Sequence, residues 1–349
     1  MEARIGTAAL TRRASEPAST LAPPAGGGAA PASVWIVSPA FDLLFFANLG
    51  WPLLLIPGLA SGGRAGPLEF FQIYFLTTPH RWITLLLVLI DPERREARAP
   101  LFLGLFGAVV AALVLLRLLA AEFLCLLLVD FAWNAWHFAA QHAGVVRIYG
   151  RRAGLPYSGL EKHGLRLFIV YVILRIPEWS TSWLPASGRS ALGGLDLLML
   201  SLPVLMVARA LGRAKGRPRP WGKLAYLLSV CGLYCSILLA LIAGRPATLT
   251  ALFLGAAIFH AVEYLAVVTH YARGRAGRGP EGTFRAMARA WAVVLIAFVL
   301  LAGTADFLVQ RYAFELAVGL NLGAAFLHYT YDALIWKLRR PNTAHALGA

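Results

Sequence analysis

The chain has 349 residues, of which 59% are hydrophobic and only 14% are charged, and its mean hydropathy is +0.67. Its apolar residues form long uninterrupted blocks, and a helix needs about 20 such residues to cross the hydrocarbon core of a bilayer. This composition excludes an ordinary soluble enzyme and predicts one integral membrane domain. The formal net charge of +15 could indicate a nucleic-acid partner, but the placement of the basic residues gives another explanation.

The predicted elements are membrane-spanning helices flanked by two tails. Residues 1–33 are rich in Ala, Pro, Gly and Ser and predict a disordered cytoplasmic tail, residues 34–341 an integral membrane helical domain, and residues 342–349 a short cytoplasmic tail. In chain order we expect ten spans, at 36–60, 68–90, 100–116, 121–146, 165–184, 192–208, 224–243, 248–271, 290–307 and 312–336. Residues 100–146 are almost continuously apolar, so a nine-span alternative would merge the third and fourth spans there.

The basic residues alternate between the two sides of this arrangement. Most of the 32 Lys and Arg fall in the tails and in the second, fourth, sixth and eighth loops. Positive charge collects on the cytoplasmic side of membrane proteins, so both termini are expected inside, and no nucleic-acid partner is expected. The nine-span alternative would break this alternation. The exceptions are Arg64, Arg117, Arg189, Arg245 and Arg311 in the other loops, and Arg81 and Arg175 within spans.

Polar residues gather in four predicted spans that all run from the outer to the inner side. Ionisable groups inside a bilayer are costly and mark candidate functional sites. One histidine in each of these spans precedes the basic inner end by a similar number of residues, which at about 1.5 Å rise per residue places all four roughly 14–21 Å from that end. The polar residues are His80 and Arg81; Asp130, Asn134, His137, Gln141 and His142; His260, Glu263 and His270; and His328 and Asp332.

This combination of imidazoles and carboxylates is suited to a divalent first-row metal such as iron, zinc, copper or nickel. Helix bundles build such sites from His and Glu spaced i, i+3, which is the spacing of His260 and Glu263. The predicted ligands are His137, His260, Glu263, His328 and Asp332, with His80 as a further ligand or an orienting partner. Asp130 is likewise either a further ligand or a partner that orients the imidazoles. Asp130 or Asp332 is also the expected catalytic carboxylate or proton relay. The alternative is that these residues only form hydrogen bonds between helices.

Three segments resemble a family of uncharacterised bacterial multi-span membrane proteins. They are residues 326–339 (FLHYTYDALIWKLR), 136–144 (WHFAAQHAG) and 260–266 (HAVEYLA). This resemblance implies the bacterial inner membrane but no particular activity. More distantly, the arrangement resembles the histidine-box membrane oxygenases and desaturases, which hold non-haem iron. His137 and His142 have the spacing of one such box, whereas the H-x-x-H-H box of those enzymes is missing.

These observations predict a membrane metalloprotein, with iron as the expected metal, that acts as an oxidoreductase on a lipid or another hydrophobic molecule. Its expected partners are membrane lipids, that substrate and an electron-donor protein. Three alternatives remain open: a proton-coupled transporter that uses the same cluster, a haem protein with paired histidines as axial ligands, and a scaffold whose polar residues join helices.

Overall fold

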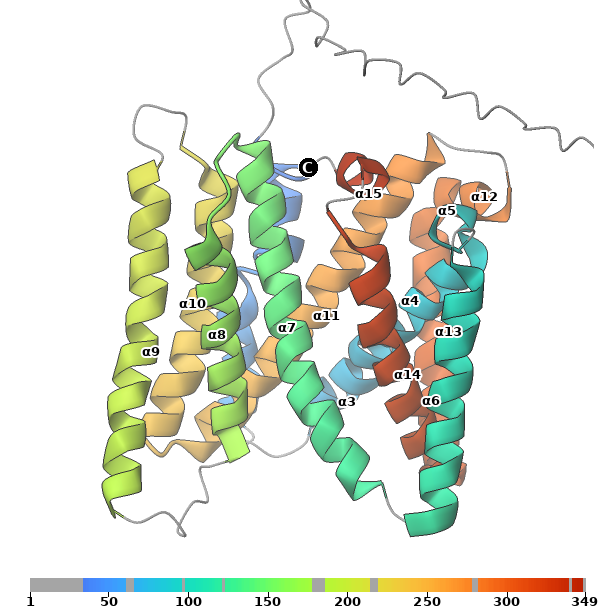
Figure 1. Cartoon of the computed structure of the whole chain (residues 1–349), viewed down its shortest axis with the longest axis horizontal. Helices are drawn as coiled ribbons and strands as arrows, with labels where there is room; N and C mark the ends of the chain where they lie inside the picture. The colour runs from blue at the N-terminus through green and yellow to red at the C-terminus, as the bar shows by residue number, and fades with distance from the viewer. Residues whose placement is uncertain are drawn as a thin grey trace, which may run out of the picture. The chain divides into compact units, whose positions relative to one another are not determined.

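The structure is a computed structural model that describes residues 34–60, 66–95, 98–120, 123–177, 186–213, 219–277, 282–338 and 341–347. Every regular element in these ranges is a helix, which confirms the predicted all-α class (Figure 1). The predicted tail over 1–33 lies outside the described residues. Within the predicted C-terminal tail, Pro341–Ala346 form a short helix, α15.

The helices follow one another with short connections. Their bounds are α1 (Pro39–Phe41), the π-helical η1 (Asp42–Phe46), the 3-10 helix η2 (Trp51–Leu54), α2 (Leu55–Ala60), α3 (Pro67–Gln72), the π-helical η3 (Ile73–Thr77), α4 (Thr78–Ile90), α5 (Pro92–Arg95), α6 (Ala99–Ala120), α7 (Leu124–Arg152), α8 (Gly159–Arg175), α9 (Ala186–Arg213), α10 (Trp221–Ile242), α11 (Pro246–Ala276), α12 (Thr283–Arg289), α13 (Trp291–Tyr312) and α14 (Phe314–Ile335).

Six helices in the described residues are long and apolar enough to cross a membrane. They are the continuous stretch Pro67–Ile90, together with Ala99–Leu119, Ala191–Gly212, Trp221–Ile242, Pro246–Ala276 and Trp291–Tyr312. Such helices satisfy their backbone hydrogen bonds internally, which is what hydrocarbon requires. The structure therefore supports an integral membrane protein.

The other predicted spans overlap helices, but each departs from a long apolar rod, and residues 121–122 and 178–184 of the predicted fourth and fifth spans lie outside the described residues. The first range is broken into four short pieces, because prolines lack an N–H donor and Asn48 has a positive φ of 45°. Helix α8 has only 17 residues, while α7 and α14 carry the polar side chains described below. Several boundaries shift: α6 runs on to Ala120, α7 to Arg152 and α9 to Arg213, and the predicted loop between the last two spans is helical, with a break at Ala313.

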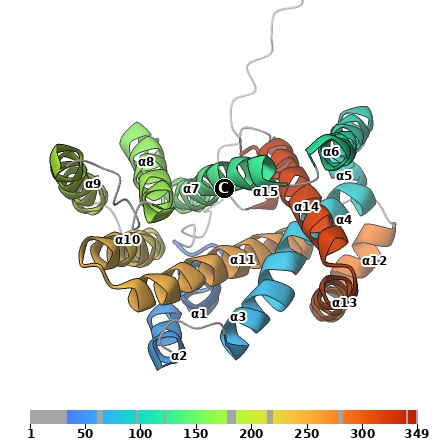
Figure 2. The same ribbon diagram turned by 90° about the horizontal axis from the view of Figure 1, so that it is seen from below.

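Helix α11 lies at the centre of the packing. It contacts α10 and α2 as well as α4 and α7, and Figure 2 shows it between α10 on one side and α4 on the other. In its most apolar stretch 72% of the residues are buried, against 6% in α6 and in α13. Apolar residues of α6 and α13 thus face outwards, as expected where lipid is the solvent, while α11 is enclosed by protein.

Four helices converge to position the site: α4, α7, α11 and α14 each contribute one histidine. Helix α4 packs on α14, and α14 packs on α7. The π-helical turn η3 directly precedes α4, and such turns are frequent next to functional residues. A side chain at Gly303 of α13 would clash with the carbonyl of Tyr74 in η3, so glycine allows the close approach that holds this turn.

Candidate functional site

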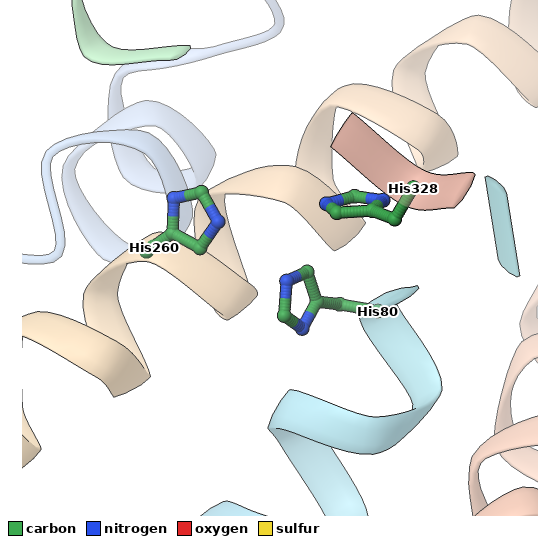
Figure 3. A group of neighbouring side chains, drawn as sticks. All are labelled: His80, His260 and His328. Atoms are coloured by element: carbon green, nitrogen blue, oxygen red, sulfur yellow. The ribbon is translucent and has the colours of Figure 1, made fainter. Parts of the chain in front are cut away.

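Four buried imidazoles form the candidate site, which we call the histidine quartet: His80 on α4, His137 on α7, His260 on α11 and His328 on α14. Their exposed fractions are 4%, 7%, 1% and 0%. The ring centroids of neighbouring members lie 4.6 to 5.2 Å apart, and the rings meet edge to face. Figure 3 shows His80, His260 and His328 directed towards one another. Each of the four helices therefore brings one histidine to a common position, as the sequence predicted, and neighbouring imidazole rings are in contact.

The ring nitrogens of the quartet are unevenly satisfied. His328 Nε2 lies 3.0 Å from His137 Nε2, while His328 Nδ1 lies 2.7 Å from Thr84 Oγ1, which turns Nε2 towards the centre. His80 Nδ1 and both ring nitrogens of His260 are buried with no hydrogen-bond partner among the described residues. A neutral imidazole has one donor and one acceptor nitrogen, and a buried group without a partner costs about 1–3 kcal/mol.

This donor set fits a metal ion. One ligand atom from each of His80, His260 and His328 lies within 4.8 Å of the others, and the same holds for His137, His328 and Asp332. Two imidazole nitrogens bound to one ion at about 2.0–2.1 Å each can be up to roughly 4 Å apart. Small rotations of these side chains would bring them to that spacing. His328 belongs to both groups and therefore connects the two sets of ligand atoms.

Asp332 lies at the edge of the quartet, within a chain of hydrogen bonds. Its Oδ2 is 3.7 Å from His328 Nε2, and its Oδ1 accepts from Tyr264 at 2.6 Å and from Thr84 at 3.3 Å. Trp336 Nε1 donates to the Tyr264 hydroxyl at 3.2 Å. Asp332 can therefore orient His328, accept a proton from it, or shift to become a ligand.

Glu263, a predicted ligand, lies in a different network, which we call the glutamate network. Its Oε2 accepts from Tyr226 and lies 3.1 Å from His142 Nδ1, while its Oε1 accepts from Gln141 at 2.9 Å. The Tyr234 hydroxyl lies 3.5 Å from His142 Nε2. Glu263, His142 and Tyr226 are fully buried. Although Glu263 is three residues from His260, its carboxylate is held by these partners and does not join the quartet.

Asp130, a predicted catalytic carboxylate, lies beside the quartet without contacting it. Tyr329 donates to Asp130 Oδ1 at 3.0 Å and approaches Asn134 Oδ1 at 3.1 Å. The Tyr329 ring in turn lies 4.8 Å from the His137 ring. Among the described residues, Tyr329 therefore links Asp130 to the quartet.

Two cavities approach the quartet from opposite halves of α11. The first, of about 290 Å³, is lined by His80, His260 and residues near the start of α11 such as Thr250. The second, of about 570 Å³, is lined by His137 and Asp332 and extends along α7 towards Arg147. The quartet thus lies between the two cavities. One cavity reaches His80 and His260, and the other reaches His137 and Asp332.

Two contacts to the quartet were not among the predicted site residues. Thr84 follows His80 by four residues, so helical spacing could have placed its hydroxyl on the same face. The Phe138 ring stacks on His260 at a centroid distance of 3.9 Å, which fixes the plane of that imidazole. No sequence pattern indicates this stack, because it depends on how α7 crosses α11.

The comparisons with known proteins identify no relative. No protein-family model matches the chain, and neither a curated protein nor a solved structure is similar to it. The resemblances drawn from the sequence therefore stay predictions.

Proposed function

We propose that this protein is a metalloprotein of the bacterial inner membrane whose histidine quartet binds a divalent metal, and that it acts as an oxidoreductase on a hydrophobic substrate. The observation that carries the proposal is His260, which has two ring nitrogens buried without a partner among the described residues and whose ring contacts the imidazoles of His80 and His137. A metal would give a lone pair of each ring a partner, whereas hydrogen bonds within the quartet leave several nitrogens unsatisfied.

Iron is the proposed metal, because imidazole is a suitable ligand for it and because the donor set contains no sulfur. When bound, it would supply one-electron and oxygen chemistry, with electrons delivered by a donor protein. The residues of the chain have separate tasks: Thr84 and Asp332 orient His328, and Phe138 fixes His260. Asp332 and Tyr264 form a path along which a proton can leave the site.

The proposed topology is ten spans with both termini on the cytoplasmic side. The alternation of basic residues supports the orientation, and the helices that coincide with the ten predicted ranges support the count. In this topology the quartet lies in the middle to inner half of the bilayer, and a lipid-soluble substrate reaches it without crossing water.

The proposal is tested by elemental analysis and an absorption spectrum of the full chain purified in mild detergent. We expect about one equivalent of iron and no Soret band, together with loss of the metal in His260→Ala and in His328→Ala. His163→Ala is the matched control, because His163 is exposed and should leave the metal content unchanged. Full metal occupancy in both quartet variants would refute the assignment of ligands.

A haem protein is less compatible with the geometry. Two axial histidines must flank a planar macrocycle, but the quartet imidazoles meet edge to face at about the spacing of ordinary ring contacts. A Soret band in the same spectrum would favour haem over the proposal.

A proton-coupled transporter is the second candidate, and one observation favours it. The two cavities end at the quartet from opposite halves of α11, as expected for a site that is reached alternately from two sides. Proton uptake by sealed vesicles containing the protein, abolished by His260→Ala and insensitive to metal chelators, would support the transporter and contradict the metalloprotein.

A further inference from the structure

The larger cavity has a strongly basic inner end that the metal site does not need. Beyond His137 and Asp332 the cavity runs between α7, α8 and α14, and its lining there includes four basic residues. They are Arg147, Lys162, Arg166 and Lys337.

These four cations have no carboxylate partner among the described residues. The nearest acidic neighbour in sequence, Glu161, is held by the buried Lys223 at 2.7 Å. All four are half-buried, and the Nε atom of Arg166 is fully buried with no hydrogen-bond partner. Like charges brought together repel one another, so an anion bound among them would stabilise this arrangement.

The rest of the cavity wall is largely apolar and aromatic. Trp133 and Trp136 line it and remain 36% and 50% exposed on the outer surface of α7. The Arg166 guanidinium lies 5.1 Å from the Trp136 ring centroid, so the apolar wall and the basic end are continuous. A molecule that enters from the bilayer thus meets an indole wall along its tail and cations at its head.

The distance between the two ends matches an extended molecule. His137 and Arg147 are ten residues apart on α7, which corresponds to about 15 Å along the helix. The cavity volume of about 570 Å³ is in the range that binds small molecules. One end therefore holds a head group while the other brings an apolar segment to the quartet.

We infer that this cavity binds a single-chain amphipathic lipid with an anionic phosphate or carboxylate head group, held by Arg147, Lys162, Arg166 and Lys337 with its tail directed to the quartet. Basic pockets between membrane helices on the inner side recognise lipid head groups, and Arg suits planar oxyanions because it can donate two parallel hydrogen bonds. The identification of this lipid as the substrate rests on the proposed function, whereas its binding does not.

The test measures binding to the full chain reconstituted in phosphatidylcholine nanodiscs, followed by tryptophan fluorescence. The probes are dodecyl phosphate, dodecylphosphocholine with the same tail, and inorganic phosphate. We expect saturable binding of dodecyl phosphate, weakened about tenfold by Arg166→Gln and by Arg147→Gln, since each removes one charge-assisted contact. Arg166→Lys keeps the charge and should retain most of the affinity. Arg209→Gln, at an exposed arginine of α9, is the control.

Equal binding to all variants, or equal affinity for dodecyl phosphate and dodecylphosphocholine, would overturn the inference. If inorganic phosphate bound as tightly as dodecyl phosphate, the cavity would bind a free anion and not a lipid head group. The metal content of the same samples separates this inference from the proposed function. If the metal-free His260→Ala variant still bound dodecyl phosphate selectively, the lipid inference would stand. If the protein retained its metal but did not bind dodecyl phosphate, only the lipid inference would be contradicted.

Discussion

Two buried polar clusters share helix α11 only three residues apart, and they differ in how their atoms are satisfied. In the glutamate network, both oxygens of Glu263 and both nitrogens of His142 have partners. In the histidine quartet, His260 has none for either nitrogen, although its ring is as deeply buried. The carboxylate and the imidazole of the glutamate network are therefore satisfied, although Gln141 Oε1 is buried without a partner among the described residues, whereas the quartet leaves His80 Nδ1 and both nitrogens of His260 without one.

We expect this difference to separate a structural role from a ligand-binding role. A buried network in which every member is satisfied rigidifies a core, and nothing is gained by adding an ion to it. Buried polar groups without partners require an explanation. A bound metal ion is one explanation that would satisfy several ring nitrogens together. We expect the glutamate network to control the free energy of unfolding and the quartet to control metal binding.

The largest expected effect on stability belongs to Glu263→Ala. This substitution leaves His142, Tyr226 and Gln141 buried without their acceptor, and breaking such a buried set costs about 3–5 kcal/mol. Thermal unfolding in detergent measures the loss. Glu315→Ala is the matched control, because Glu315 pairs with Arg117 at an exposed position where an ion pair contributes about 0–1 kcal/mol. If the two variants unfolded alike, the glutamate network would have no structural role.

Thr84→Val should have an intermediate effect, on metal affinity instead of stability. The variant keeps the shape of the side chain but removes the hydroxyl that orients His328, and loss of such a partner typically lowers metal affinity about 10–100-fold. Competition with a chelator of known affinity measures the change. The control is Thr330→Val, because the Thr330 hydroxyl bonds only to carbonyls of its own helix. An unchanged affinity in Thr84→Val would show that the Thr84 hydroxyl does not orient a metal-binding His328.

Tyr226→Phe should have the smallest effect. The hydroxyl's contacts to Glu263 and to His142 Nδ1 are lost, but His142 and Gln141 still donate to that carboxylate. We expect a loss of roughly 1–2 kcal/mol of unfolding free energy with an unchanged metal content. A fall in metal content would show that the two clusters act as one site and would remove the distinction between them.

The sequence predicted the helical class and the gathering of the four histidines, for a simple physical reason. Each histidine lies on a separate span at a similar distance from the basic inner end. Ionisable side chains inside a bilayer are costly, so those at a similar depth are expected to face one another. Depth in a membrane can be counted along the chain, so His80 and His328 could be assigned to one layer before the structure was known.

The partners within that layer could not be predicted in the same way. Helical spacing places His260 and Glu263 on neighbouring faces of one helix, but it does not say which helix fills the space beside each. Helices α7 and α10 meet α11 on the side of Glu263 and supply His142 and Tyr226. The boundaries of the last two spans were likewise missed, because α13 and α14 are separated by a single residue.

The central claim, that the quartet binds a metal through its imidazoles, is tested most directly by X-ray absorption spectroscopy at the metal edge of the purified full chain. We expect nitrogen ligands with the outer-sphere scattering of several imidazole rings, no sulfur, and loss of that signal in His260→Ala. A protein without bound metal after reconstitution with iron, or a metal spectrum without imidazole scattering, would contradict it.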